Sequence, residues 1–343
     1  MAAALRARGH RVDLVALDGS FPSPTPAALE AAGRALASIA AGTIAVIDSL
    51  ALGAMSELVA GEAARLRIVA LMHLPLAATV GLEPAQATRF EVAERRALQA
   101  AALVIITGHA ARPLLARYNL PDDRIVVIEP GTDPARLARG SGPAQAGPRE
   151  RSYAGSGCSR TIELLCVGTL NPIKGHEILL DALAAVPNRT WHLTCAGSVT
   201  RDPVTAGRVR AAIARHGFVD RVTLAGDLDR GALGVCYDRA DLFVLATRQE
   251  TYGMAVAEAL ARGLPVVATV TGALPELVGN DAGILVPVGD TVALAAALAR
   301  VLDDPSLGAR LAEGARRVRD RLPSWDDAAN RMTAALTALD AHG

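Results

Sequence analysis

The stretch Arg248-Gln249-Glu250-Thr251-Tyr252-Gly253-Met254-Ala255-Val256-Ala257-Glu258-Ala259 joins an apolar run of strand length, residues 240–246, to a segment of helical composition, residues 254–262. Glu250 would lie in the loop at the end of the strand. Glu258 would lie in the helix, about 9 Å further along at about 1.5 Å per residue. This strand, loop and helix indicate one unit of an α/β fold, with a carboxylate on each side of the turn.

The backbone N–H groups near Tyr252, Gly253 and Met254 have no partner inside the expected helix, so they form an anion site between the two carboxylates. A nucleotide-sugar would fit this spacing. Its sugar hydroxyls would lie on Glu250, its diphosphate on the helix start and its ribose diol on Glu258. The same stretch also fits a capped, solvated amphipathic helix, so the rest of the chain has to decide between the two interpretations.

The composition favours layered α/β domains. The 343 residues suffice for two domains, and 51% hydrophobic with only 3% aromatic residues suits parallel sheets covered by Ala-rich helices. The 35 basic and 35 acidic residues give a formal net charge of zero, which argues against a nucleic-acid partner.

No apolar run reaches the roughly 18 residues that span a bilayer, and residues 5–9 lack the apolar core of a secretory signal. The four cysteines show no C-x-x-C spacing and are expected to be buried thiols rather than metal ligands or disulfides: Cys158, Cys166, Cys195 and Cys236. We therefore expect a soluble cytoplasmic protein without a membrane span, for which peripheral contact with a membrane stays open.

Strands and helices alternate twice along the chain, which indicates two parallel-sheet, doubly wound domains facing a cleft. The strands are expected at residues 12–17, 43–47, 67–71, 103–107 and 125–128, and then at 163–167, 191–196, 221–225, 242–245, 265–268 and 284–286. The predicted organisation is an N-terminal Rossmann-like domain (1–139), a Gly/Pro/Ser-rich linker (140–157), a nucleotide-sugar-binding domain (158–322) and a C-terminal helix (323–343). We expect a serine to cap the N-terminus of this helix. Packing of the helix on the N-terminal domain is one arrangement that the sequence allows.

An ordered set of motifs resembles the retaining glycosyltransferases of family four, which have the GT-B fold. The set comprises Met72-His73-Leu74-Pro75, Glu129-Pro130-Gly131-Thr132-Asp133, residues 166–175 (CVGTLNPIKG), the E-x7-E pair Glu250 and Glu258, residues 263–268 (GLPVVA) and residues 272–278 (GALPELV). The resemblance implies transfer of a sugar from a nucleoside diphosphate donor to an unknown acceptor hydroxyl, with retention at the anomeric carbon. It implies no metal and no bound cofactor, and no Asp-x-Asp stretch stands where a metal-dependent transferase would need one.

The resemblance also assigns roles to residues. Lys174, Glu250 and His73 would be catalytic. The donor would be bound by Gly168, Thr169, Lys174, Gly197, Tyr252, Gly253, Met254 and Glu258. At Thr169 many members carry a phosphate-binding arginine, so this sequence lacks a charged, bidentate donor there.

Four further polar residues stay outside the expected site. Asp48 and Asp133 follow strands and could contact an acceptor or only cap a loop, and His109 and His176 are expected to be structural. In the mechanism that the resemblance implies, Lys174 stabilises charge on the departing diphosphate, whose oxygen accepts the acceptor's proton.

The chain opens on what resembles the end of the family's first helix, so the first strand and its Gly-rich loop are expected to be missing. We expect such a sheet to lack its middle ladder and the N-terminal domain to be loosened. A catalytically impaired nucleotide-sugar-binding or scaffold protein is therefore the alternative to an enzyme. Another GT-B enzyme, an epimerase or a phosphorylase, is a third hypothesis, weakened by the Lys174 and Glu250 motifs.

Overall fold

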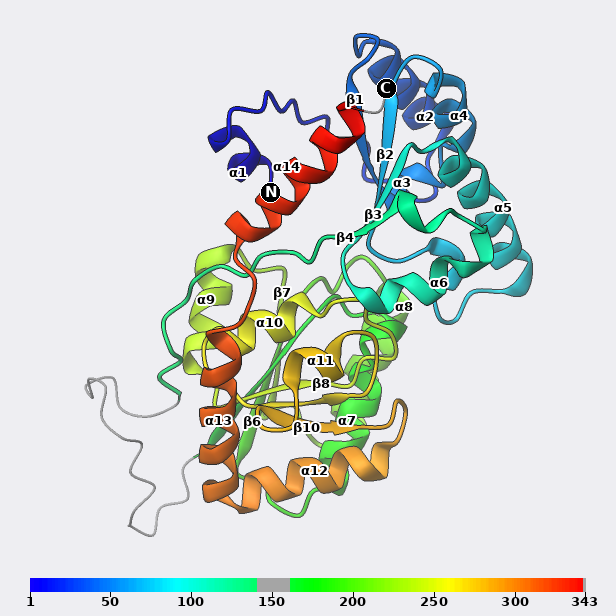
Figure 1. The fold of residues 1–343 in the computed structure, drawn as a ribbon. Helices are drawn as coiled ribbons and strands as arrows, with labels where there is room; N and C mark the ends of the chain where they lie inside the picture. Colours follow the sequence, from blue (N-terminus) through cyan, green and yellow to red (C-terminus); the bar gives the residue numbers. More distant parts are fainter. Residues whose placement is uncertain (141–160, 342–343) are drawn as a thin grey trace. The chain divides into compact units, whose positions relative to one another are not determined.

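The computed structural model describes residues 1–140 and 161–341, which form two compact units (Figure 1). Unit 1 comprises Met1–Gly131 with Pro323–Gly343, and unit 2 comprises Thr132–Leu322. The division therefore falls ahead of residue 139, where we expected the first domain to end. The predicted linker at 140–157 lies outside the described residues except for Gly140.

Unit 1 contains a four-stranded parallel sheet in the order β1-β2-β3-β4. Its strands are β1 (Ile44–Asp48), β2 (Arg67–Met72), β3 (Leu103–Ile106) and β4 (Ile125–Val127). Each lies within one residue of its predicted bounds, because each is a short apolar run that stands out in the sequence, and most residues of β2 and β3 are buried.

Helices cover both faces of this sheet. They are α1 (Ala2–Ala7), α2 (Pro26–Ala37), α3 (Ser49–Leu52), α4 (Ser56–Glu62), α5 (Pro84–Ala100), α6 (Arg112–Leu115) and α14 (Trp325–Ala341), with short 3₁₀ turns η1 (Leu76–Ala78), η2 (His109–Ala111), η3 (Ala116–Tyr118) and η4 (Asp122–Arg124).

Because right-handed crossovers through strands in sequence order place the connecting helices on one face, the other face needs a separate cover. That cover is α14, together with α1, and its apolar core includes Leu5, Val69, Leu103, Ile105, Ile128, Ala328, Ala329 and Met332 (Figure 1). The predicted Ser cap of α14 is confirmed: Ser324 Oγ accepts the Asp327 N–H at 3.1 Å, and Asp327 Oδ2 accepts the Ser324 N–H at 3.0 Å.

Two predictions for unit 1 are wrong. Residues 12–17 form no strand, and Leu14 and Val15 are 72% and 57% exposed. An extended segment becomes a strand only when a neighbour takes its backbone hydrogen bonds, and among the described strands of this sheet none pairs with residues 12–17. The expected gap in the middle of the sheet is also absent from the described residues, since β1 to β4 pair consecutively and leave β1 at an edge.

Unit 2 contains a six-stranded parallel sheet in the order β10-β9-β8-β5-β6-β7. Its strands are β5 (Ile162–Val167), β6 (Trp191–Ala196), β7 (Val222–Gly226), β8 (Leu242–Leu245), β9 (Val266–Thr269) and β10 (Gly283–Val286). The chain runs outward from β5 in one direction and then from β8 in the other. The junction of β5 and β8 is therefore the topological switch point, where open α/β sheets bind their ligands.

The helices of unit 2 complete a large apolar core around both faces of the sheet. They are α7 (His176–Ala185), α8 (Pro203–Arg215), α9 (Arg230–Arg239), α10 (Met254–Leu260), α11 (Leu274–Val278), α12 (Thr291–Asp303) and α13 (Pro305–Arg319), with the 3₁₀ turn η5 (Pro172–Lys174). As predicted, Cys166 and Cys195 are buried free thiols, while Cys236 is half-buried and Cys158 lies outside the described residues.

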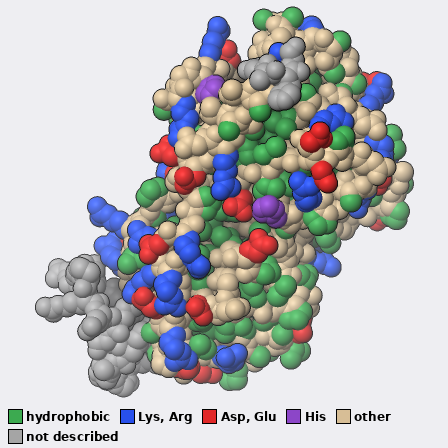
Figure 2. All heavy atoms as spheres, in the orientation of Figure 1, with side chains coloured by type: hydrophobic (Ala, Val, Ile, Leu, Met, Phe, Trp, Pro, Cys, Tyr) green, Lys and Arg blue, Asp and Glu red, His purple; other side chains and the backbone are tan. Residues whose placement is uncertain are grey.

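Acidic and basic side chains are interspersed on the face shown in Figure 2, in keeping with the zero net charge of the sequence. Within the described part of the chain, no helix combines the length and the apolar composition that crossing a membrane requires.

Candidate functional site

Two loops meet at the switch point of unit 2, one after β5 and one after β8. Lys174 ends the first loop, and Glu250 lies in the second, 76 residues later. Their side chains form an ion pair, with Lys174 Nζ 2.7 Å from Glu250 Oε2. The side chains are 24% and 15% exposed, so the pair is largely shielded from water while still accessible to a ligand. The structure thus brings together two of the three predicted catalytic residues.

Backbone bonds fix the Lys174 loop. The Asn171 side chain caps η5 by accepting the Lys174 N–H at 3.1 Å. The carbonyl of Ile173 accepts the Arg248 N–H at 2.6 Å and the Thr247 hydroxyl at 3.1 Å, which joins the two loops directly. Lys174 is also the one lysine in the 343-residue sequence, in which every other cationic side chain apart from histidine is arginine.

Gly175 shows why the two loops can approach so closely. Its φ is +66°, and a Cβ added there would lie 2.0 Å from the carbonyl oxygen of Ala246. Both the conformation and the space therefore require glycine at this position. The sequence already indicated a turn here, but the close approach to the second loop appears only in the fold.

Gly168, Thr169 and Gly197 lie where β5 and β6 end. The Gly168 N–H donates to Ala196 at 2.8 Å, and a Cβ at Gly197 would lie 2.2 Å from the Gly168 carbonyl oxygen. The two strand ends therefore pack backbone to backbone. Thr169 is half-buried and brings no charge to the site.

Tyr252, Gly253 and Met254 form the start of α10, as predicted. Gly253 is the N-cap with φ +98°, and a Cβ there would lie 2.5 Å from Leu274 Cδ2. Tyr252 is buried, with 5% of the residue exposed, so its side chain offers a ligand little surface. The role of these three residues in donor binding stays a prediction.

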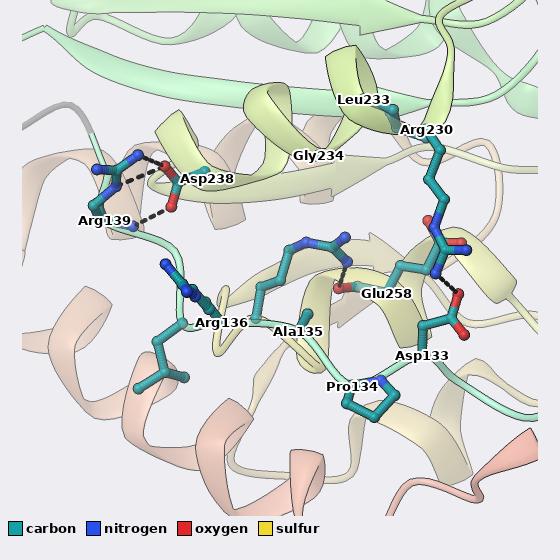
Figure 3. A pocket seen from close by; sticks show the side chains of 12 residues that line it. Asp133, Pro134, Ala135, Arg136, Arg139, Arg230, Leu233, Gly234, Asp238 and Glu258 are labelled. Carbon is teal, nitrogen blue, oxygen red and sulfur yellow. Dashed lines mark hydrogen bonds and ion pairs between the residues drawn. The ribbon is translucent and has the colours of Figure 1, made fainter.

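Glu258 lies on α10 and lines a pocket of about 470 Å³ (Figure 3). Burial raises the pKa of the Tyr237 hydroxyl well above its usual range, and the neighbouring Glu258 carboxylate raises it further. Tyr237 donates to the Ala255 carbonyl at 3.1 Å and stacks under the Arg262 guanidinium at 4.4 Å from its ring centroid. Glu258 therefore lies beside two closely packed polar side chains, Tyr237 and Arg262.

Four arginines and three carboxylates give this pocket a charged lining: Asp133, Arg136, Arg139, Arg230, Asp238, Glu258 and Arg262. Arg230 pairs with Asp133 at 2.6 Å, and the Arg139 guanidinium pairs with Asp238 at 2.5 Å (Figure 3). Apart from Glu258 and the open alternatives for Asp133, sequence reasoning missed this lining, because no motif connects residues 97 positions apart.

His73, the third predicted catalytic residue, belongs to unit 1. Its Nε2 lies 3.1 Å from Asp48 Oδ2, with both side chains about half exposed. Although burial works to raise the pKa of Asp48, hydrogen bonds from His73 and from the Leu50 N–H lower it overall. His73 directly follows β2 and Asp48 is the last residue of the neighbouring strand β1, so the sheet itself brings them together.

The two histidines expected to be structural differ in their surroundings. His176 is buried at 2% exposure with Nε2 3.7 Å from Cys166 Sγ, as expected for a packing residue. His109 begins η2 on the surface. Among the described residues, no group of three His, Cys, Asp or Glu side chains is arranged to hold a metal ion.

Residues 1–136 match the family described as Glycosyltransferase Family 4, and residues 161–304 match the family described as Glycosyl transferases group 1. These two matches take in the sheets of both units. The chain belongs to glycosyltransferase family 4.

Curated relatives of this family 4 chain include a D-inositol 3-phosphate glycosyltransferase from Xylanimonas cellulosilytica, 32% identical over 235 residues, which are 67% of this chain and 55% of the relative. The corresponding protein of Salinispora tropica is 33% identical over 251 residues, 68% of this chain and 50% of that relative. The chain thus spans about half the length of the curated relatives it matches.

Among solved structures, sucrose-phosphate synthase from Thermosynechococcus elongatus has a TM-score of 0.78 at 23% identity, covering 100% of this family 4 chain and 92% of that one. Anabaena HepE, solved with UDP and glucose, has a TM-score of 0.73 at 20% identity, covering 91% and 81%. Likeness at these identities shows the fold, and the predicted GT-B fold class is confirmed.

Proposed function

We propose that the protein is a retaining, metal-independent glycosyltransferase that moves a sugar from a nucleoside diphosphate-sugar to an acceptor hydroxyl, without a bound cofactor. The observation that carries the proposal is the Lys174–Glu250 pair at the switch point of unit 2. The pair puts a cation and a carboxylate where open α/β sheets receive nucleotides. Membership of family 4 narrows the ligand to a nucleotide-sugar.

Each part of the donor has proposed partners. Lys174 and the backbone N–H groups near Gly253 bind the diphosphate, Glu258 binds the ribose diol, and Glu250 with His73 orients the sugar. Gly168, Thr169, Gly197, Tyr252 and Met254 shape the donor site around these groups.

The leaving group of such a donor is already activated, so catalysis consists of positioning and charge stabilisation. The bond from the anomeric carbon to the diphosphate oxygen breaks, and the acceptor oxygen bonds to the same face of the sugar. The acceptor's proton passes to the departing phosphate oxygen. Lys174 stabilises the negative charge that develops there, and one such donor contributes about 10²–10³-fold in rate.

A charge count favours a second candidate. Lys174 and Glu250 cancel each other, and Thr169 is neutral, so the pair and the turn bring no net positive charge to a diphosphate. A nucleotide-sugar-binding protein with little or no transfer activity is therefore the alternative. Arg248 is an exposed cation in the second loop, and its backbone N–H donates to the carbonyl of Ile173, the residue before Lys174.

The test is release of nucleoside diphosphate from a panel of nucleotide-sugars, with and without trial acceptors and with and without EDTA. UDP-glucose comes first because the Anabaena protein was solved with it, and inositol phosphates are trial acceptors because the curated relatives carry that name. We expect acceptor-dependent release that EDTA leaves unchanged and that Lys174→Met slows about 10²–10³-fold. Tight donor binding without release would establish the alternative, and an inverted product would refute retention.

A further inference from the structure

Unit 1 contains a carboxylate in its interior, Glu94 of α5, which is 0% exposed. Its partners are three neutral donors. Oε1 accepts the Leu76 N–H at 2.5 Å, and Oε2 accepts the Ala77 N–H at 3.1 Å and the Tyr118 hydroxyl at 2.6 Å. An ionised carboxylate accepts all three hydrogen bonds, whereas a protonated one has to turn a donor of its own toward them.

This arrangement is costly for a residue that only fills space. Removing a carboxylate from water costs several kcal/mol, and an apolar residue of similar volume is often as stable or more stable in such a place. The backbone also makes room for Glu94, because a Cβ at Gly53 would lie 2.8 Å from Glu94 Cγ. Glu94 therefore fixes a geometry that packing alone would leave free.

The geometry that it fixes is the turn after β2. Leu76 and Ala77 lie in η1, three and four residues after His73, and their N–H groups both point to the Glu94 carboxylate. At its other end the turn is held by the His73–Asp48 contact at 3.1 Å and by the His73 N–H, which lies 3.4 Å from Ser49 Oγ.

We propose that Glu94 is a positioning residue for sugar transfer, which sets the turn from residue 73 to 78 and so the direction in which His73 presents its ring to the donor sugar. The inference rests on the proposed function. A side chain that acts on a reacting sugar has to be held in place by neighbours whose own conformations are fixed. Displacing such a side chain by about 1 Å lowers the rate about 10²-fold.

The positioning role of Glu94 can also be tested through the pH at which its carboxyl group ionises. Burial raises the pKa of Glu94, while the hydrogen bonds from Tyr118, Ala77 and Leu76 and the charge of Arg117 oppose the rise. The other charged groups near Tyr118 are Arg95, 5.8 Å from its ring centroid, and Glu91 on the same helix. As the pH falls through the raised pKa, the carboxylate protonates and releases one of its three donors.

The experiment compares Glu94→Gln with Glu57→Gln, the same change at an exposed carboxylate of α4 that pairs with Arg96 of α5 and contacts neither Glu94 nor Tyr118. We expect Glu94→Gln to lower kcat about 10–100-fold. Calorimetric affinity for free nucleoside diphosphate should stay within twofold of wild type. Hydrogen exchange should accelerate at Leu76 and Ala77 but not at β2, and Glu57→Gln should change none of these.

Tyr118→Phe keeps the inference falsifiable should Glu94→Gln fail to fold. It removes one charge-assisted hydrogen bond that lowers the pKa of Glu94. The pH below which kcat declines should therefore move up by about one pH unit. A purely structural carboxylate would leave that pH unchanged.

Two results overturn the inference alone: wild-type kcat in Glu94→Gln despite faster exchange at Leu76 and Ala77, or a kcat of Tyr118→Phe that declines below the same pH as in wild type. A wild-type chain that binds nucleoside diphosphate but releases it from no donor in the panel would refute the proposed function, and this inference with it.

Discussion

The Lys174–Glu250 pair makes a prediction that runs against the usual effect of deleting a site residue. If the diphosphate and Glu250 compete for the same ammonium group, Glu250→Gln should tighten the binding of a free nucleoside diphosphate. Lys174→Ala should weaken it about 10–100-fold, because it removes a charge-assisted hydrogen bond of about 1.5–3 kcal/mol.

The size of the gain follows from the geometry. At 2.7 Å the attraction is about 1.5 kcal/mol if water screens the pair fully and about 6 kcal/mol at an effective dielectric constant of about 20. Desolvation offsets part of this attraction, and coupling energies between contacting residues are about 0.5–3 kcal/mol. Freeing Lys174 from about 1–3 kcal/mol of coupling corresponds to binding that is about 5–150-fold tighter.

Isothermal calorimetry with UDP, GDP and ADP measures these affinities in wild type, both single variants and the double variant. Glu313→Gln is the control, because it breaks the exposed Glu313–Arg316 pair of the same unit without touching the site. An unchanged or weaker affinity in Glu250→Gln would refute the competition. As the one lysine, Lys174 can also be followed directly, since ¹³C reductive methylation keeps its charge and labels only it and the N-terminal amine.

Three further predictions concern other residues. Gly175→Ala should lower the free energy of unfolding in urea by about 3 kcal/mol or more, and Gly217→Ala by only about 1 kcal/mol, because both have φ near +66° but only the first Cβ meets a backbone oxygen. Glu258→Gln should mainly weaken nucleotide binding and Glu250→Gln should mainly lower kcat; an equal loss of nucleotide affinity in both would contradict this division. The lowered pKa of Asp48 means that its hydrogen bonds stabilise the fold above pH 3.8, and that this contribution is lost as the pH falls through the lower folded value. The Tm gap between wild type and Asp48→Asn should therefore be constant above about pH 5 and close toward pH 2, and a gap independent of pH would count against the contact.

The sequence was sufficient to predict those strands whose side chains are buried on both faces of the sheet. All four residues of β8 are buried, so its apolar run was visible without any knowledge of its neighbours. Residues 12–17 have a similar composition but no partner strand among those described, and pairing is a property of the sheet rather than of the segment.

The contacts inside the site were harder to predict. Lys174 and Glu250 were recognised separately, but their contact depends on β5 lying beside β8, which only the strand order shows. The Arg230–Asp133 pair had no sequence signal. Glu94 had one that sequence reasoning overlooked: it is acidic, yet it lies at helical spacing from Ala97 and Leu98 on the apolar face of α5.

Unit 1 is built from two separate stretches of the chain, so unit 2 is an insertion between them. Residues 132–322 leave unit 1 after Gly131 and return at Pro323. A Cβ at Gly131 would lie 2.2 Å from the backbone nitrogen of Trp325, so the exit and the re-entry points are adjacent. Insertions whose ends lie side by side can be excised and rejoined with a short linker. Residues 132–322 can therefore be treated as a cassette, expressed alone to titrate nucleotides, while a chain joined from 131 to 323 keeps α14 to cover its sheet.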